Sequence, residues 1–544
     1  MTQRIGLCIA IAWLVFTVIA FAYNRSGYAG IVLIIGLIVF VSCGWALARI
    51  GLRRAVSFIS PVSVRLTLFS AVGCAWLLMI SMAAAMLTMS DGISAVSLVS
   101  YGAIVQNTSL MFIVYAAIIM SYGAFGNFVQ RRLQIELRSG FEGYIRTLII
   151  GFCVSVIFFY GAALIGVLNW ISFIVYLLAA ALVGWKDARH LWRSRHGTLI
   201  SFSFSDTDAA LRSCFVATMG IVLVLSCIAQ FGFHPLGSDD LRTYYLVPKT
   251  FVEQRHIVQF PHDLLNNGPV AFAYGYAPYL LFGDRYLTII NILAFILMLG
   301  AVYAIAQRWF GSRVGIAAIF FVSTVPLMYE LLYTVKADLW MATILLGAVL
   351  LLFDERADYR QAFLAGVLMG LAFAVKYNAL FFIIAAFMGV VLWHWYRNRS
   401  ARHSLVYGML LVGALVIGYA PWGLRMVWLT GNPIYPFLTG GSILQHQTPL
   451  DPAAEREFEM FNNAFLNYHE SLNGAQPASI NVWHLVTSAP SYGGNRLGPL
   501  FFGMIGFLAL AFRRLQRSEK ERLLLFAGIS VFAGMIWFYV SVSQ

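Results

Sequence analysis

Charged residues are scarce in this chain. Only 11% of its 544 residues are Asp, Glu, Lys or Arg, whereas 60% are hydrophobic. A soluble domain carries about 25% charged residues, so the composition excludes an ordinary soluble protein. Apolar runs of roughly 20 residues, the length that a helix needs to cross a bilayer, recur along the whole sequence. The fold class that we predict is an all-α polytopic membrane protein.

Cysteine is also scarce, and no cysteine falls in a long loop. All six cysteines lie within or at the edge of predicted membrane spans: Cys8, Cys43, Cys74, Cys153, Cys214 and Cys227. This placement excludes a disulfide framework and a CxxC metal site. The histidines of the longer loops are scattered, and no pair has the spacing of a helical metal site. The sequence therefore names no certain cofactor.

The apolar runs predict about fifteen transmembrane helices. We place them near residues 5–23, 29–48, 66–89, 109–129, 147–165, 168–185, 214–232, 286–307, 314–331, 337–353, 361–376, 378–395, 404–425, 497–512 and 523–541. The formal net charge is +13, which by itself would suggest a nucleic-acid partner. Alternate loops, however, hold 26 of the 36 Lys and Arg residues. By the positive-inside rule these loops and the N-terminus are cytoplasmic, so the basic balance is a topology signal and a nucleic-acid role is not favoured.

The loop lengths divide the chain into three parts. Residues 1–185 hold six spans with short loops and form a predicted N-terminal membrane bundle. Residues 186–213 are a basic cytoplasmic linker, suited to anionic headgroups. Residues 214–544 hold nine spans and two long outer loops, at about 233–285 and 429–496.

The long outer loops also contain predicted short helices. Ser238 is a good N-cap, so a helix is expected over 239–247, stopped by Pro248. The apolar and aromatic segment 269–282 is too short to span comfortably and is expected to be re-entrant or interfacial. In the second loop, Asp451-Pro452 is expected to open a surface helix.

An acidic pair, Asp239-Asp240, stands just outside the seventh span. A carboxylate close to lipid is costly and usually has a task. The structural alternative is that acids in the first turn of a helix are favoured by the helix dipole, by about 0.3–1 kcal/mol. The pair is therefore either a catalytic group at the membrane surface or a simple helix start.

Three further positions bring charge to the outer ends of spans. Lys336 and Asp338 stand where the tenth span begins, as headgroup anchors or as functional groups. Lys376-Tyr377 separates two apolar runs with no room for a loop, so the ammonium is costly unless it meets an anion such as a lipid phosphate. The alternative there is a tight turn exposed to headgroups. Arg425 could clamp a phosphate bidentately or anchor the end of its helix.

These residues resemble, in order, the motifs of GT-C-type bacterial glycosyltransferases, which include protein-mannosyltransferase-like and aminoarabinose-transferase-like enzymes. Four motifs carry the resemblance: Asp239-Asp240-Leu241-(x)4-Leu246-Val247-Pro248-Lys249, Lys336-Ala-Asp338-Leu339, Gly370-Leu-Ala-Phe-Ala-Val-Lys376-Tyr377, and Pro421-Trp422-(x)2-Arg425 leading into Thr430-Gly-Asn-Pro-Ile-Tyr-Pro436. Each motif is short and weak alone, and the resemblance covers roughly residues 214–544.

The resemblance implies inverting transfer of a sugar from a polyprenyl-phosphate donor to a lipid, polysaccharide or protein acceptor. Asp239 would be the general base or a metal-associated carboxylate, and Asp240 would orient it, raise its pKa or share a divalent cation with it. Lys249, Lys376 and Arg425 would stabilise the charge of the leaving phosphate. A divalent cation is thus an open alternative.

The same resemblance makes Lys336, Asp338 and Tyr377 substrate- or phosphate-binding residues. It fails at one point, because relatives often show Tyr-His after the acidic pair, where this chain has Tyr244-Tyr245. These two tyrosines, with Tyr274 and Tyr276, could form an aromatic floor for the substrate, although an interfacial aromatic belt is the favoured interpretation.

Two other classes of protein compete with an enzyme. A transporter or lipid flippase for envelope glycoconjugates would place ionisable residues near mid-membrane and would contain broken helices. Here the charged candidates gather at the outer edge, which disfavours ion coupling. A non-catalytic scaffold would not need a lysine next to lipid. We therefore expect a multi-pass protein of the cell (inner) membrane, with its active site on the periplasmic or extracellular side.

Overall fold

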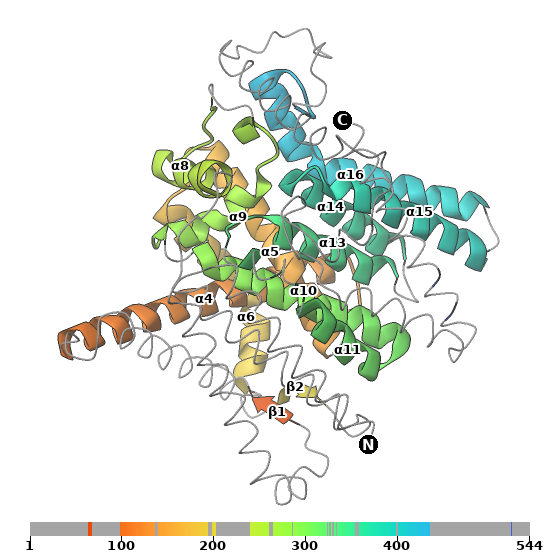
Figure 1. The fold of residues 1–544 in the computed structure, drawn as a ribbon, viewed down its shortest axis with the longest axis horizontal. Coiled ribbons are helices and arrows are strands. Elements are labelled where there is room, and N and C mark those ends of the chain that lie inside the picture. The colour runs from red at the N-terminus through yellow and green to blue at the C-terminus, as the bar shows by residue number, and fades with distance from the viewer. Residues whose placement is uncertain are drawn as a thin grey trace, which may run out of the picture.

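The computed structural model describes residues 64–67, 98–136, 140–193, 198–202, 240–260, 265–284, 287–323, 325, 328, 331–332, 334–353, 358–398, 401–435, 520 and 524. Almost all of these residues are helical (Figure 1). The exception is a ribbon of two antiparallel strands, β1 (Val64–Thr67) and β2 (Thr198–Phe202), in which Val64 pairs with Phe202. The all-α expectation missed this ribbon, because a four-residue pairing between distant segments leaves no periodic signal in the sequence.

Nine of the ten predicted spans from 109–129 to 404–425 each overlap one described helix. These helices are α4 (Leu98–Arg132), α5 (Phe141–Leu164), α6 (Trp170–Arg193), α10 (Leu287–Phe310), α11 (Ser312–Ser323), α13 (Asp338–Leu352), α14 (Tyr359–Val375), α15 (Ala379–Asn398) and α16 (Ala401–Thr430). The predicted spans 5–23, 29–48, 214–232 and 497–512 lie outside the described residues. Only single residues or short pieces of 66–89 and 523–541 are described.

Four stretches of described helix are long and apolar enough to cross a membrane: Ile113–Arg132, Phe141–Leu164, Ile290–Phe310 and Ser404–Leu429. Five further apolar helices are shorter. The protein is therefore an integral membrane protein built from helices. The side on which the N-terminus lies stays a prediction.

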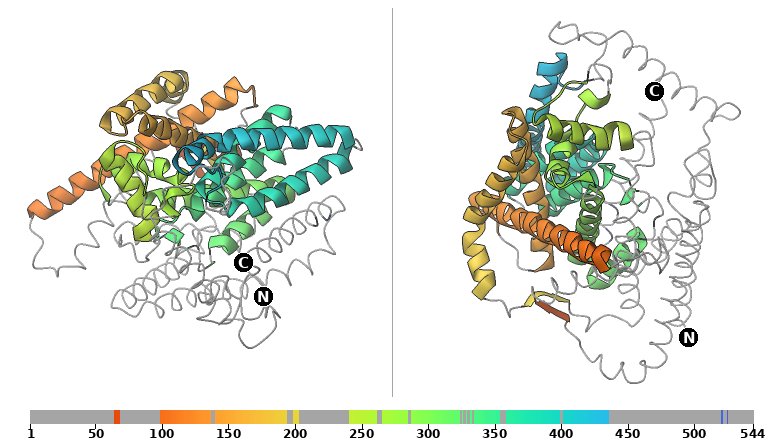
Figure 2. Two further views of the ribbon diagram at one scale, coloured as in Figure 1. Left: turned by 90° about the horizontal axis from the view of Figure 1, so that it is seen from above. Right: turned by 90° about the vertical axis from the view of Figure 1, so that its left-hand side faces the viewer.

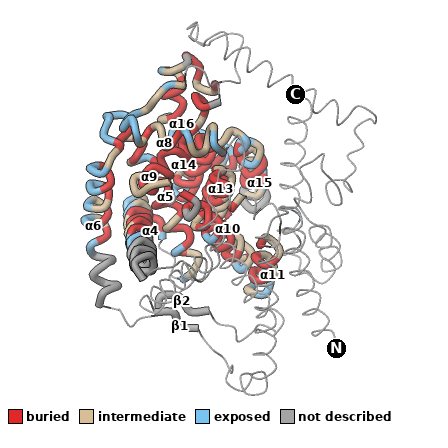
Figure 3. The backbone as a smooth tube through the Cα atoms, turned by 60° about the vertical axis from the view of Figure 1, so that its left-hand side comes forward, coloured by how far each residue is buried: buried red, intermediate tan, exposed pale blue. Residues whose placement is uncertain are grey.

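The core lies where α5 packs against α4, α9 (Ala271–Leu280), α10 and α13, and where α14 packs against α13 and α16. Buried residues are concentrated on these helices, whereas much of α6 is exposed (Figure 3). Figure 2 shows α15 and α16 running side by side. The helices α4, α5 and α6 thus share one hydrophobic core with the later described helices. The domain boundary at 186–213 stays a prediction.

Glycine allows the closest helix pairs to form. A Cβ atom on Gly151 of α5 would collide with the carbonyl of Tyr122 in α4, and one on Gly370 of α14 would collide with the carbonyl of Leu415 in α16. Helices in membranes associate largely through such close packing, because lipid provides little hydrophobic driving force between them.

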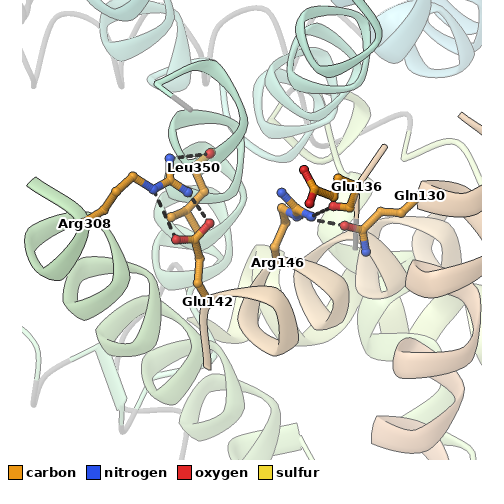
Figure 4. A network of polar contacts seen from close by, with 6 residues as sticks. All are labelled: Gln130, Glu136, Glu142, Arg146, Arg308 and Leu350. Carbon is orange, nitrogen blue, oxygen red and sulfur yellow. Dashed lines mark hydrogen bonds and ion pairs between the residues drawn. The ribbon is translucent and has the colours of Figure 1, made fainter. Parts of the chain in front are cut away.

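A polar network ties the helices together at one end of the bundle (Figure 4). Glu142 at the start of α5 forms an ion pair with Arg308 near the end of α10, and Arg308 Nη1 donates to the Leu350 carbonyl of α13 at 3.0 Å. Arg146 Nε donates to Gln130 Oε1 of α4 at 2.8 Å. The positive-inside rule predicts that this end is cytoplasmic.

The first long loop forms η1 (Asp240–Tyr245, a π-helical turn), α8 (Leu246–Gln254) and η2 (Leu265–Asn267) before α9. The prediction that Pro248 stops the helix was wrong, because α8 continues to Gln254. Pro248 is the third residue of α8, in the first turn, where a backbone N–H has no partner within the helix.

The short helix α9 is enclosed by protein. All ten of its residues are buried, and it packs between α5 and α8. Tyr274 and Tyr276 are fully buried, so they are not part of an aromatic belt at the membrane surface. Tyr244 and Tyr245 are half-buried. The helix predicted to open at Asp451 lies outside the described residues.

Candidate functional site

Polar side chains from distant parts of the chain meet at the end of the bundle opposite Glu142 and Arg308. Asp338 lies in the first turn of α13, Lys376 directly follows α14, and Arg425 lies near the end of α16. The segment η1–α8 and the buried α9 lie beside them (Figure 1). The folding of the helices thus brings together three of the four motifs and the described part of the first one.

Lys376 and Asp338 form an ion pair. Lys376 Nζ donates to both carboxylate oxygens of Asp338, at 2.8 and 3.0 Å. Lys376 terminates α14 in an extended conformation, and α15 starts again at Ala379, which confirms the tight turn. The anion that the sequence requires near Lys376 is supplied within the protein by Asp338, because α13 and α14 are neighbours.

Tyr244 of η1 also lies near this ammonium, with Lys376 Nζ 5.8 Å from its ring centroid. Burial lowers the pKa of Lys376, but Tyr244 and Asp338 raise it by more, so the pKa lies above the ordinary lysine value. Lys376 is therefore a fixed cation at neutral pH, and it links η1 to α13 and α14.

Two buried side chains, Asn291 and Tyr276, hold the backbone that precedes α13. Asn291 Nδ2 donates to the carbonyls of Thr334 at 2.6 Å and Lys336 at 3.1 Å. Tyr276 Oη donates to the Val335 carbonyl at 3.0 Å. Among the described residues, the half-buried Lys336 side chain has no ion-pair partner.

A second polar cluster fastens η1 and α8 to the segment before α10. Tyr245 Oη donates to Asp284 Oδ2 at 2.6 Å, and Lys249 Nζ donates to Tyr245 Oη at 2.7 Å and to Asp284 Oδ2 at 3.1 Å. The hydrogen bonds to Tyr245 and Asp284 hold the pKa of Lys249 above its ordinary value. Lys249, predicted as a phosphate-binding cation, is thus already paired, and its partner Asp284 was not predicted.

Arg425 differs from the two lysines because its charge has no protein counter-ion among the described residues. The side chain is 2% exposed, and Nη1 donates to the Gly268 carbonyl at 3.2 Å. Its Nε and Nη2 atoms are buried and have no hydrogen-bond partner among the described residues. The guanidinium lies 5.9 Å from the ring centroid of Phe251 and interacts electrostatically with Tyr274 and Tyr377.

A buried guanidinium with unused donors is costly, since taking a charge out of water costs several kcal/mol even after relaxation. An anionic ligand would remove this cost, and the planar donor fork of arginine matches phosphate oxygens. Arg425 is therefore the strongest anion-binding candidate among the described residues.

Tyr377 and Tyr419 hold the turn that follows α16. Tyr377 Oη donates to the Tyr435 carbonyl at 2.9 Å, and Tyr419 Oη donates to the Pro433 carbonyl at 2.6 Å. Burial and the adjacent Tyr419 raise the pKa of Tyr377, so its hydroxyl stays protonated. The geometry gives Tyr377 a role in positioning the Gly431–Tyr435 turn beside Arg425.

The loop between α8 and α9 is fixed by asparagines. Asn267 exchanges two hydrogen bonds with the backbone of Phe260, at 2.9 and 2.7 Å, and Asn266 Nδ2 donates to the Arg242 carbonyl at 3.0 Å. Both asparagines are buried. The backbone of η1, which starts at Asp240, is thereby held against the start of α9.

Asp239 lies outside the described residues, and Asp240 is described only as the first residue of η1. Among the described residues, no group of three or more His, Cys, Asp or Glu side chains is placed to hold a metal ion. The catalytic role of the acidic pair and its divalent cation therefore stay predictions.

One comparison with known proteins returned a match. Residues 268–422 match the family model described as dolichyl-phosphate-mannose-protein mannosyltransferase. The matched segment includes Lys336, Asp338, Lys376 and Tyr377, and it ends three residues before Arg425. No curated protein and no solved structure matches the chain. Through this segment the chain is similar to membrane glycosyltransferases of the GT-C superfamily.

Proposed function

We propose that the protein transfers a sugar, with inversion, from a polyprenyl-phosphate donor to an acceptor on the outer face of the membrane. The observation that carries the proposal is the buried Arg425 guanidinium, which has two unused donors and no protein counter-ion among the described residues. It lies at the same end of the bundle as the Lys376–Asp338 pair of the family-matched segment.

In this proposal Arg425 binds the phosphate of the donor. As the bond between the anomeric carbon and the phosphate oxygen breaks, negative charge grows on the leaving polyprenyl phosphate. Cations that are already in place stabilise that charge without a reorganisation cost. Arg425 is positioned in advance by its bond to Gly268 and by Phe251.

Lys376 has a different part. Its ammonium forms an ion pair with Asp338 and lies near Tyr244. It therefore contributes a positive potential to the site and also fixes η1 beside α13 and α14. Lys249 acts similarly through Asp284, as a fastening of α8. Lys336 has no ion-pair partner among the described residues, and we propose it as a second contact for the donor.

The acceptor hydroxyl attacks the anomeric carbon on the face opposite the phosphate and must lose its proton. We propose Asp239 as the general base that takes this proton, with Asp240 orienting it or sharing a divalent cation. The anchored backbone of η1 supports the proposal, because it ties the segment that follows Asp239 to the Lys376 side of the site.

The proposal is tested by sugar transfer in proteoliposomes supplied with radiolabelled polyprenyl-phosphate sugars and a panel of lipid, polysaccharide and peptide acceptors. Asp239→Asn is expected to lower the rate by about 10²–10⁴-fold, the usual contribution of general-base catalysis. Glu253→Gln removes an exposed carboxylate of α8 and should leave the rate unchanged.

Two results would contradict different parts of the proposal. Equal rates for wild type and Asp239→Asn would remove Asp239 from the chemistry. No transfer by wild type from any lipid-linked sugar, with protein shown to be folded, would overturn the donor class.

A further inference from the structure

Tyr160 of α5 reaches the candidate site from a part of the chain that the family match does not cover. Its hydroxyl donates to the carbonyl of Pro421 in α16 at 2.7 Å, although the two residues are 261 positions apart. The helix α5 also packs beside α9 (Figure 3). One tyrosine therefore connects the N-terminal helices to the helix that carries Arg425.

The carbonyl that Tyr160 contacts is one helical turn before Arg425. In an α-helix the carbonyl of residue 421 faces the N–H of residue 425. The Tyr160 hydroxyl therefore binds the carbonyl that lies next to the backbone N–H of Arg425. A proline inside a helix removes one hydrogen bond and tends to bend the helix. The Tyr160 bond fixes α16 at this weakened point.

The Tyr160 ring has the same neighbours as the guanidinium. Its centroid lies 5.0 Å from that of Tyr274 in an edge-to-face contact, and 5.3 Å from that of Trp422. Arg425 interacts electrostatically with both Tyr160 and Tyr274. Tyr160 thus packs within the aromatic wall around Arg425 and also holds the backbone from which Arg425 projects.

We propose that Tyr160 is a positioning residue for Arg425, so that α5, which precedes the glycosyltransferase domain, is a working part of the phosphate site. This inference rests on the proposed role of Arg425 in binding a prenyl phosphate. It assigns to α5 a function in donor binding in addition to packing.

The test measures binding of a prenyl phosphate by the full-length protein in detergent. Farnesyl phosphate is titrated against the melting temperature, and farnesol, which has the same chain without the phosphate, is the ligand control. Tyr160→Phe removes only the hydroxyl. The matched control is Tyr176→Phe, which removes a buried hydroxyl of α6 that accepts a 2.8 Å bond from Ser121.

We expect farnesyl phosphate to stabilise wild type more than farnesol does, and Arg425→Gln to lose this difference. Tyr160→Phe should need about two- to tenfold more farnesyl phosphate, the factor expected for one hydrogen bond. The response of Tyr160→Phe to farnesol should not change. If Tyr160 were only structural, the substitution would alter the melting temperature of the unliganded protein but not the farnesyl phosphate titration. Tyr176→Phe should titrate as wild type does.

Two outcomes would overturn the inference, and they are distinguishable. If wild type responds selectively to the phosphate but Tyr160→Phe titrates identically, or Tyr176→Phe weakens as much, the positioning role fails while the phosphate site stands. If wild type does not distinguish farnesyl phosphate from farnesol, the phosphate site itself fails and the inference fails with it.

Discussion

Arg425→Met should weaken donor binding without lowering the stability of the ligand-free protein. The substitution keeps an unbranched side chain of similar length but removes the charge and all the donors. If Arg425 were a structural residue, the substitution would lower the stability of the protein. If Arg425 serves to bind an anionic ligand, the substitution would mainly lower the affinity for that ligand.

The loss of affinity follows from the two unused donors, Nε and Nη2 of Arg425. A hydrogen bond involving a charged group contributes about 1.5–3 kcal/mol, so two bonds to phosphoryl oxygens contribute about 3–6 kcal/mol. This corresponds to roughly 10²–10⁴-fold weaker binding of a prenyl phosphate.

The effect on stability has two opposing parts. The methionine leaves the Gly268 carbonyl without its 3.2 Å partner, which costs about 1–3 kcal/mol. It also removes a charge that is 2% exposed and has no counter-ion among the described residues, a desolvation cost of several kcal/mol. The unliganded protein should therefore melt at the same temperature as wild type or higher.

The assay is thermal unfolding in detergent with and without farnesyl phosphate. Arg402→Met is the matched control, because it makes the same chemical change at an exposed position in the first turn of the same helix. A melting temperature for Arg425→Met several degrees below wild type, combined with unchanged affinity for the phosphate, would refute the reasoning and make Arg425 a structural residue.

Three further outcomes are expected from the other charged groups. In a double-mutant cycle of Lys376→Met and Asp338→Asn, the two changes should couple by about 1–3 kcal/mol in unfolding, and additive effects would contradict the ion pair. Glu142→Gln should destabilise the protein by about 3–5 kcal/mol, because it leaves the Arg308 charge buried, while the affinity for farnesyl phosphate stays at the wild-type value; a large change in affinity would show that this end of the bundle is coupled to the site. The pKa of Lys249 is higher in the folded protein than in the unfolded chain. Its stabilising contribution to folding is therefore complete below the unfolded pKa of about 10.4 and is lost only as pH rises through the folded pKa. Lys249→Met should accordingly lower the melting temperature equally at about pH 6 and about pH 9. A difference that shrinks by pH 9 would contradict that sign.

The described helices were predictable because hydropathy is a local property that each span carries in its own residues. The ends were less predictable. For example, α5 begins at Phe141, six residues before the predicted span. Its first turns contain Glu142 and Arg146, which lower the hydropathy but are paired with the side chains of Arg308 in α10 and Gln130 in α4. Hydropathy marks the apolar part of a helix, and the tertiary contacts decide how far the helix continues.

The candidate residues were predictable as residues, but their partners were not. Lys376 was expected to need an anion, with a lipid phosphate as one example, and the structure pairs it with Asp338, 38 positions earlier. Asp284 has no motif around it that would have identified it as the partner of Lys249. Such pairs depend on which helix ends become neighbours, and local patterns do not carry that information.

The sequence by itself determined the class of the protein, a helical membrane protein, together with its spans in the described region and its likeness to GT-C glycosyltransferases. Composition, hydropathy and short motifs are properties of contiguous residues, so they can be read without a fold. Only the tertiary structure decided which cations are neutralised within the protein. It pairs Lys376 and Lys249 with aspartates and leaves Arg425 buried with donors that have no partner among the described residues. It also brings Tyr160 of α5 into contact with α16, the helix that carries Arg425. The physical reason is that the electrostatic state of a side chain depends on distance and burial, which are set by the packing of helices far apart in the chain.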